Sequence, residues 1–105
     1  MKAFKEYQEK ARVTKLYPNI GKNISYAVLG LAGEAGELAN ELKKGIRDEN
    51  FKEPDGSLLD SRREKMIYEL GDVLWYTSCI ADELGISLEE VAEKNIEKLY
   101  KRHNK

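Results

Sequence analysis

Hydrophobic positions near the start of the chain recur every three or four residues. This spacing predicts an amphipathic first helix from about Lys2 to Lys15, because residues at these intervals share one face of a helix. The repeating positions are Phe4, Tyr7, Ala11 and Thr14. Pro18 disfavours helical backbone at the residue before it, so we expect this helix to end there.

A second helix is predicted from about Asn23 to Lys44. Either Asn23 or Ser25 can cap its first turn, and Gly45 is a typical stop signal after a helix. The stretch from Arg47 to Asp60 carries asparagine, proline, aspartate and glycine, which are turn-forming residues. We therefore expect a loop there.

Two more helices are predicted from capping boxes, in which a serine and a glutamate three residues later satisfy the free amides of a first turn. The third begins at Ser61 with Glu64 and ends near Gly85, and the fourth begins at Ser87 and runs to the end of the chain. No segment alternates strictly enough for a strand. The sequence thus predicts an all-α fold, a four-helix bundle, in a single domain spanning residues 1–105.

Composition narrows the class of protein. The chain has 105 residues, of which 41% are hydrophobic and 35% are charged, with a formal net charge of −1. This balance argues against a general binder of nucleic acid or membrane surfaces. No apolar run is long enough for a membrane span, the N-terminus lacks the apolar core of a signal peptide, and Cys79 is the one cysteine. We therefore expect a cytoplasmic protein that binds neither nucleic acid nor membrane. Because so short a chain buries a thin core, we also expect it to associate with itself.

Two acidic motifs echo each other along the chain. Glu34 and Glu37 are three residues apart on the second helix, and Glu69 and Asp72 are three apart on the third. Each pair lies on the flank of an apolar stripe: Leu31, Ala35, Leu38 and Leu42 on the second helix, and Met66, Leu70, Val73, Thr77 and Leu84 on the third. If the stripes pack together, the four carboxylates converge along one groove.

Four carboxylates close together require a compensating cation. Oxygen ligands favour Mg²⁺, or Mn²⁺ as its substitute, over zinc. Asn95, Lys98 and Arg102 follow the corresponding flank of the fourth helix, beside its stripe Leu88, Ala92, Ile96 and Leu99. The two basic side chains suit the phosphate oxygens of a substrate, although they also complement the C-terminal end of a helix dipole.

Two other features of the long helices leave alternatives open. Glycines within these helices either allow close helix packing or leave room for a ligand. Acidic residues three positions apart also often form a solvent-exposed face with no binding role. The glycines are Gly30, Gly33, Gly36 and Gly71. Tyr68, Trp75 and Cys79 lie off the main stripe of the third helix, where they suit a base-stacking wall, a dimer contact or a second core face, and we expect the core face. His103, the one histidine, is expected to be exposed and inert.

The segments LGLAGEAGELANELKK, YELGDVLWY and NIEKLYKR together resemble the MazG-like nucleotide pyrophosphohydrolases of the all-α NTP pyrophosphatase superfamily. The resemblance covers nearly the whole chain. It implies Mg²⁺-dependent hydrolysis of a nucleoside triphosphate, NTP or dNTP, to the monophosphate and pyrophosphate. It also implies a bundle completed by assembly into a homodimer or homotetramer.

The same resemblance assigns roles to residues. Glu34, Glu37, Glu69 and Asp72 are expected to bind the metal, and Glu34 and Glu37 to be catalytic, with Glu37 orienting the attacking water. The distal polar positions Asn95, Lys98 and Arg102 are expected to contact the substrate. The gap between Glu37 and Glu69 is longer than in many members, and the excess lies in the 47–60 loop, which we interpret as a lid or a subunit contact. Two alternative functions stay open: a non-catalytic helical interaction module, and the same fold acting on another nucleotide pyrophosphate.

Overall fold

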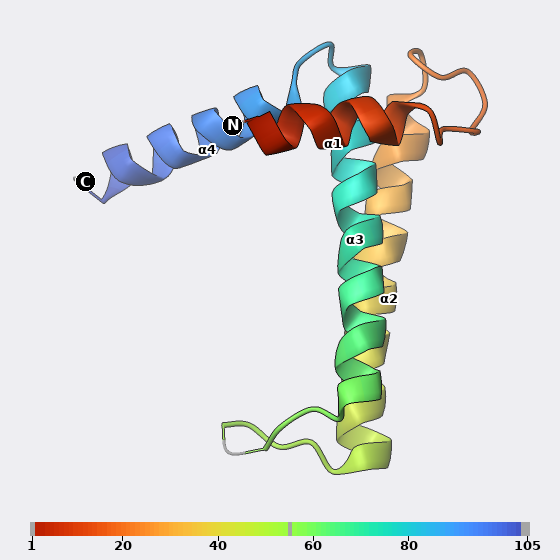
Figure 1. Cartoon of the computed structure of the whole chain (residues 1–105), viewed down its shortest axis with the longest axis vertical. Helices are drawn as coiled ribbons and strands as arrows, with labels where there is room; N and C mark the ends of the chain where they lie inside the picture. Colours follow the sequence, from red (N-terminus) through yellow and green to blue (C-terminus); the bar gives the residue numbers. More distant parts are fainter. Residues whose placement is uncertain (1, 55, 104–105) are drawn as a thin grey trace. The chain divides into compact units, whose positions relative to one another are not determined.

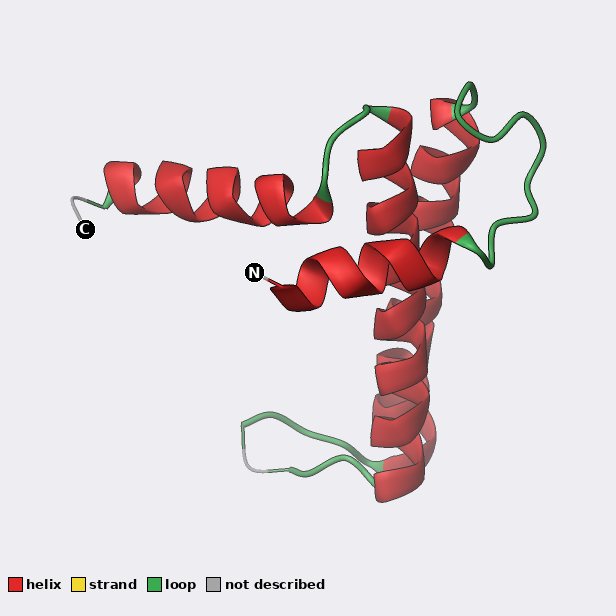
Figure 2. Cartoon of the chain, turned by 45° about the horizontal axis from the view of Figure 1, so that its top comes forward, coloured by secondary structure: helices red, strands yellow, loops and turns green. Residues whose placement is uncertain are grey.

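The structure is a computed structural model that describes residues 2–54 and 56–103. Within these ranges it contains helices and loops and no strand (Figures 1 and 2). The helices are α1 (Lys2–Arg12), α2 (Ile24–Glu49), α3 (Asp60–Glu83) and α4 (Leu88–Arg102). The predicted all-α fold with four helices is therefore confirmed.

Two of the predicted caps are confirmed. The Asn23 side chain accepts a hydrogen bond from the backbone amide of Tyr26 at 3.2 Å, so Asn23 caps α2. The Ser87 hydroxyl accepts from the amide of Glu90 at 3.0 Å and caps α4. Both side chains satisfy amides that a first turn leaves without a helical partner.

The predicted end of the second helix is wrong. α2 continues through Gly45 to Glu49, and the residue with left-handed backbone is Asn50, at φ 56°. Gly45 is buried, and a Cβ placed on it would lie 3.3 Å from the side chain of Leu58. Packing against the following loop therefore explains this glycine, and the loop is shorter than predicted, covering residues 50–59.

The other helix boundaries differ by smaller amounts. α3 begins at Asp60, so Ser61 lies inside the first turn and cannot act as the predicted cap. α3 ends at Glu83 and α1 at Arg12, before Gly85 and Lys15.

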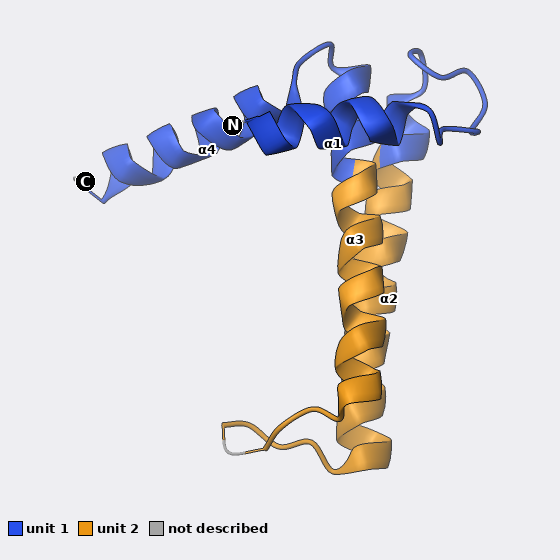
Figure 3. Ribbon diagram, viewed as in Figure 1, with its two compact units in different colours: residues 1–27, 77–105 blue, residues 28–76 orange. Residues whose placement is uncertain are grey.

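The chain divides into two compact units, shown in different colours in Figure 3. Unit 1 consists of residues 1–27 and 77–105, and unit 2 of residues 28–76. A single domain over the whole chain stays a prediction.

In unit 1, α1 packs against α4, and two neighbouring carboxylates of α3 hold the N-terminal segment. Asp82 accepts hydrogen bonds from Gln8 at 2.8 Å and Arg12 at 3.0 Å, and it pairs with the buried ammonium group of Lys15. Glu83 accepts from the amides of residues 21 and 23 and from the hydroxyl of Tyr17 at 3.1 Å.

Gln8 is buried and joins three elements of unit 1. Besides donating to Asp82, its amide nitrogen donates to the carbonyl of Ile86 at 3.2 Å, and its oxygen accepts from the amide of Leu88 at 2.8 Å. All of the fully buried apolar residues among those described belong to unit 1: Ala11, Tyr17, Ala27, Cys79, Ala81 and Leu88.

Unit 2 contains most of α2 and of α3, which form an antiparallel pair joined by the 50–59 loop (Figure 1). The residues that line the seam between the helices recur every three or four positions, as in a coiled coil. They are buried or half-buried: Leu31, Glu34, Leu38, Glu41 and Gly45 on α2, and Arg62, Met66, Glu69, Val73 and Tyr76 on α3.

This seam differs from the predicted apolar stripes. Ala35 and Leu70, which we expected to face the partner helix, are exposed, as is Leu84 in unit 1. Glu34 and Glu69, which we placed on the flanks, occupy the seam itself. The α2–α3 contact is therefore more polar than the apolar pattern predicted.

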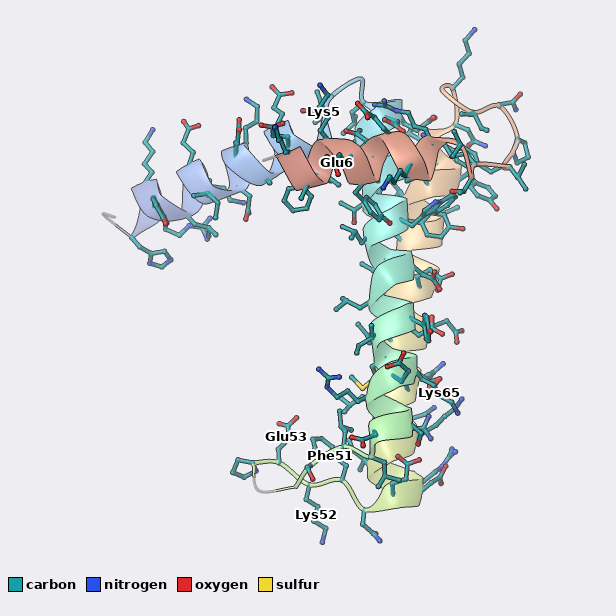
Figure 4. The ribbon with its side chains drawn as sticks, in the orientation of Figure 1. Lys5, Glu6, Phe51, Lys52, Glu53 and Lys65 are labelled. Atoms are coloured by element: carbon teal, nitrogen blue, oxygen red, sulfur yellow. The ribbon has the colours of Figure 1, made fainter. Side chains whose placement is uncertain are left out.

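The residues on either side of the seam follow from helix geometry. Each step along a helix turns by about 100°, and because α2 and α3 are antiparallel, one step forward from each seam position turns both helices toward the same side. One step forward gives Ala32, Ala35, Ala39, Leu42 and Ile46 on α2 with Arg63, Ile67, Leu70, Leu74 and Thr77 on α3. Most of these residues are apolar, so we call this the apolar side; Val28 lies on it one turn before Ala32. One step back gives Gly30, Gly33, Glu37, Asn40 and Lys44 on α2 with Ser61, Lys65, Tyr68, Asp72 and Trp75 on α3. We call this the acidic side, after Glu37 and Asp72. Figure 4 labels Lys65 beside the α2–α3 pair.

Asp82 gives a test of unit 1. Burial raises the pKa of Asp82, but the hydrogen bonds and charges of Arg12 and Lys15 outweigh it and hold that pKa below its usual value. We expect Asp82→Asn to lower the free energy of unfolding by about 3 kcal/mol at pH 7, because the buried ammonium group of Lys15 loses its counter-charge. Urea denaturation measures this loss.

The pH dependence has a definite sign. A depressed carboxyl pKa stabilises the fold above the unfolded value, about 3.9, and this contribution is lost as pH falls through the folded value. The difference in stability between wild type and Asp82→Asn should therefore shrink below about pH 4. A difference that is unchanged down to pH 2 would contradict the role given to Asp82.

Candidate metal centre

Three of the four predicted metal ligands come together in unit 2. One carboxylate oxygen from each of Glu34, Glu69 and Asp72 lies within 4.8 Å of the other two. Glu34 and Glu69 are half-buried in the seam and Asp72 is exposed beside it. Three carboxylates that converge from two helices form a donor set suited to a hard divalent cation such as Mg²⁺ or Mn²⁺.

The surroundings of Glu34 show the electrostatic cost of this arrangement. Burial, the charge of Asp72 and the hydrogen-bonded carboxyl of Glu69 raise the pKa of Glu34. The charges of Glu69 and Glu37 raise it further. The groups that shift this pKa are thus all acidic, so negative charge accumulates in the seam without a compensating cation from these residues.

Glu37, the fourth predicted ligand, lies next to this group. Its side chain is exposed, and it is not one of the three carboxylates that converge. Its charge nevertheless raises the pKa of Glu34, so it lies within electrostatic reach. This position allows Glu37 to act on a water molecule or a substrate beside the three seam-side carboxylates.

In the next layer of the same seam, an arginine neutralises a buried glutamate. Seven residues beyond Glu34, about 10 Å along the helix, Glu41 is buried and pairs with Arg62, which lies seven residues before Glu69. The same guanidinium donates to Glu49 at 2.6 and 3.2 Å, and this hydrogen bonding lowers the pKa of Glu49. One layer therefore places arginine opposite glutamate, while the other places glutamate opposite glutamate.

The glycines within the helices fall into two groups, one that allows close helix packing and one that leaves open space. A Cβ on Gly30 would overlap the ring of Tyr76, so Gly30 allows close helix approach one turn before Glu34. A Cβ on Gly33, which lies on the acidic side, would meet nothing within 4 Å, as would one on Gly36 or Gly71. Packing inside unit 2 therefore does not explain these three, and Gly33 leaves room beside the acidic group.

The residues predicted to contact substrate lie in the other unit. Asn95, Lys98 and Arg102 are exposed on α4, spaced so that they share one face of that helix. Their role stays a prediction. The expected core face of α3 is confirmed for Cys79, which is fully buried, while Trp75 is half-buried and packs edge-on against Tyr76. It is wrong for Tyr68, which is 68% exposed. His103 is exposed, as expected.

Sequence reasoning missed Arg62 and its partners. The signal was the seven-residue spacing, since Glu41 repeats the position of Glu34 and Arg62 repeats that of Glu69. The apolar pattern concealed this relation because these seam positions are charged.

Comparisons with known proteins show which sequences the chain is similar to. Residues 23–105 match the model of the MazG nucleotide pyrophosphohydrolase domain family. Residues 1–22, which include α1, precede the matched region. No solved structure matches the chain. Among the described residues, no helix has the length and apolar character needed to cross a membrane.

Two curated relatives cover nearly the whole chain. The chain is 38% identical over 104 residues to the gene 37 protein of Mycobacterium phage L5, covering 94% of this chain and 87% of the phage protein. It is 33% identical over 101 residues to the uncharacterized protein YvdC of Bacillus subtilis strain 168, covering 96% of this chain and 90% of YvdC. Neither name states an activity.

The contrast between the two seam layers predicts opposite effects of the same substitution. Without divalent cations at neutral pH, Glu34→Gln should raise the melting temperature because it removes charge repulsion from the acidic layer. The raised pKa of Glu34 has the matching sign, since it favours the folded state below the ordinary value of 4.5 and that contribution is lost as pH rises through the folded value. Glu41→Gln is the matched control and should lower the melting temperature, because Arg62 loses a buried counter-charge.

Thermal melts with EDTA and with Mg²⁺ or Mn²⁺ complete this test. Cation should stabilise the wild type and Glu41→Gln, since a ligand that binds the folded state raises its stability, and it should stabilise Glu34→Gln much less. An equal gain in all three proteins would rule out the acidic group as the cation site.

Proposed function

The chain belongs to the MazG nucleotide pyrophosphohydrolase domain family, and from this we propose that it hydrolyses nucleoside triphosphates, NTP or dNTP, to the monophosphate and pyrophosphate in a Mg²⁺-dependent reaction. The observation that carries the proposal is the seam layer in which Glu34 lies against Glu69 and Asp72. A layer of acids without arginine is costly in a purely structural seam, and it is what a cation-dependent phosphate site requires.

Glu34, Glu69 and Asp72 would hold the cation, with Glu37 beside them. A bound divalent cation supplies positive charge that offsets the carboxylates and polarises phosphate oxygens. Glu37 is exposed next to the group, so its carboxylate is the one we assign to orient water and accept its proton.

In the proposed reaction the water oxygen forms a bond to the α-phosphorus. The bond from the α-phosphorus to the oxygen that bridges to the β-phosphorus breaks, and pyrophosphate leaves with that oxygen. The water proton passes to Glu37. Lys98 and Arg102 would bind phosphate oxygens, since ammonium and guanidinium groups form charge-assisted hydrogen bonds with them, and Asn95 would contact the substrate through its amide.

We also propose that the working form is a homo-oligomer, a homodimer or homotetramer, that covers the apolar side of unit 2. Among the described residues of this unit, no apolar side chain is fully buried. On the apolar side, Val28, Leu70 and Leu74 are 46%, 56% and 36% exposed. Two antiparallel helices with one apolar side are half of a four-helix bundle, and a second copy of the pair supplies the other half.

The activity test uses purified protein with Mg²⁺ and a panel of NTPs and dNTPs, with product analysis. We expect pyrophosphate and monophosphate from the wild type, and a drop in kcat of at least about a hundredfold for Glu37→Gln and for Asp72→Asn. Release of orthophosphate would contradict the proposed bond cleavage, and turnover of a different nucleotide pyrophosphate alone would shift the substrate class. Absence of turnover without cation-dependent stabilisation would favour a non-catalytic helical module.

The assembly test is Leu70→Glu, which places a charge at the centre of the apolar side. Light scattering should show wild type larger than a monomer and the variant shifted toward monomer, since an unpaired charge is excluded from an apolar interface. Lys65→Ala, on the acidic side, is the control and should keep the wild-type mass. A variant that keeps its mass with Glu at position 70 would place the interface elsewhere.

A further inference from the structure

An exposed aromatic side chain borders the acidic group. Tyr68 is 68% exposed, directly precedes Glu69, and lies four residues before Asp72 on the acidic side. Residues four apart on a helix are neighbours, with Cβ atoms about 5–6 Å apart. The side chain of Tyr68 is therefore a neighbour of Asp72, one of the carboxylates that would hold the cation.

The register of the helices places two α2 residues across from it. The contacts of Glu34 with Glu69 and of Glu41 with Arg62 fix the antiparallel alignment, in which each step forward on α2 corresponds to a step back on α3. This alignment puts Tyr68 at the level of Ala35, about 3 Å along the axis from Glu37. The exposed Asn40 lies on the same side, about 7 Å from the level of Tyr68 and closer to the 50–59 loop. Tyr68 and Asn40 thus lie on either side of Glu37, on the acidic side of the α2–α3 pair.

The lysines near this end already act on carboxylates of the chain. The Nζ atom of Lys44 lies 3.8 Å from the Oε2 atom of Glu41. The charge of Lys65 acts on Glu49, adding to the effect of the hydrogen bonds from Arg62. Besides these lysines, the acidic side presents an aromatic face and an amide, which suit a nucleobase better than a phosphate chain.

We propose that Tyr68 and Asn40 form the nucleobase subsite, with the base stacked on the Tyr68 ring and its edge hydrogen-bonded to the Asn40 amide. This inference rests on the proposed function. The ribose separates a base from its α-phosphate, so a base contact must lie beside the acidic group rather than within it. Every base has a π-face that stacks on an aromatic ring, and an amide offers both a donor and an acceptor to a base edge.

The test compares Tyr68→Ala, Tyr68→Leu and Tyr68→Phe in Mg²⁺-dependent turnover of NTPs and dNTPs. We expect Ala and Leu to raise KM by about tenfold and Phe to keep the wild-type KM, because only Phe retains a ring for stacking. Inorganic triphosphate, which has no base, serves as a competitive inhibitor. Its inhibition constant should be the same in all four proteins.

A second variant tests the edge contact. Asn40→Ala should change the order of KM values among the bases while the inhibition constant of inorganic triphosphate stays at the wild-type value. Wild-type KM values in Tyr68→Ala, an equal rise for inorganic triphosphate, or rescue by Leu as good as by Phe would each overturn the subsite. The proposed function fails separately, through absence of wild-type turnover. In that case the binding of an NTP to wild type and Tyr68→Ala in Mg²⁺, measured by calorimetry, still decides the subsite.

Discussion

The function proposed for unit 2 depends on one unfavourable contact, a carboxylate facing a carboxylate across a helix seam. Glu34 is half-buried against Glu69 and Asp72, and its pKa is raised by burial and by these acids. In a seam built only for stability this position would carry an apolar residue or an acid paired with a base, as Glu41 is paired with Arg62. On our proposal, a bound cation would relieve the repulsion among these carboxylates, so affinity for the cation and lower stability without it would have the same origin.

Two contacts on either side of the acidic layer fix its geometry. Toward the loop, Arg62 joins Glu41 and Glu49 and ties α3 to α2 through charge-assisted hydrogen bonds. Toward the other end, the ring of Tyr76 occupies the space that a side chain on Gly30 would need. A slip of one helix along the other would break both contacts. The repelling carboxylates are therefore held together by favourable contacts outside their own layer.

The sequence was sufficient for the helices and for two caps, because these depend on local spacing. It also identified three acids that meet, Glu34, Glu69 and Asp72, but it placed Glu34 and Glu69 on the flanks of the stripes and not in the seam. The ends of α2 and α3 were wrong because Gly45 is buried against Leu58 and Ser61 lies inside the helix. The predicted face of each helix was right for Leu31, Leu38, Met66 and Val73, which lie in the seam, and wrong for Ala35 and Leu70, which are exposed. α2 carries two adjacent stripes, and the apolar pattern through Leu31 and Ala35 mixes the seam with the apolar side. Which stripe meets α3 depends on the Glu41–Arg62 pair, which a search for apolar residues cannot find.

Antiparallel geometry explains how one pair of helices can serve both chemistry and assembly. A one-residue step forward from the seam leads on both helices to the apolar side, and a step back leads on both to the acidic side. The two sides are therefore separated by about 200° around each helix, with the seam between them. On our proposals, a second copy covers one side while the substrate approaches the other. The acids of the seam lie between these surfaces, so assembly that rigidifies α2 and α3 also holds the carboxylates in place for the cation.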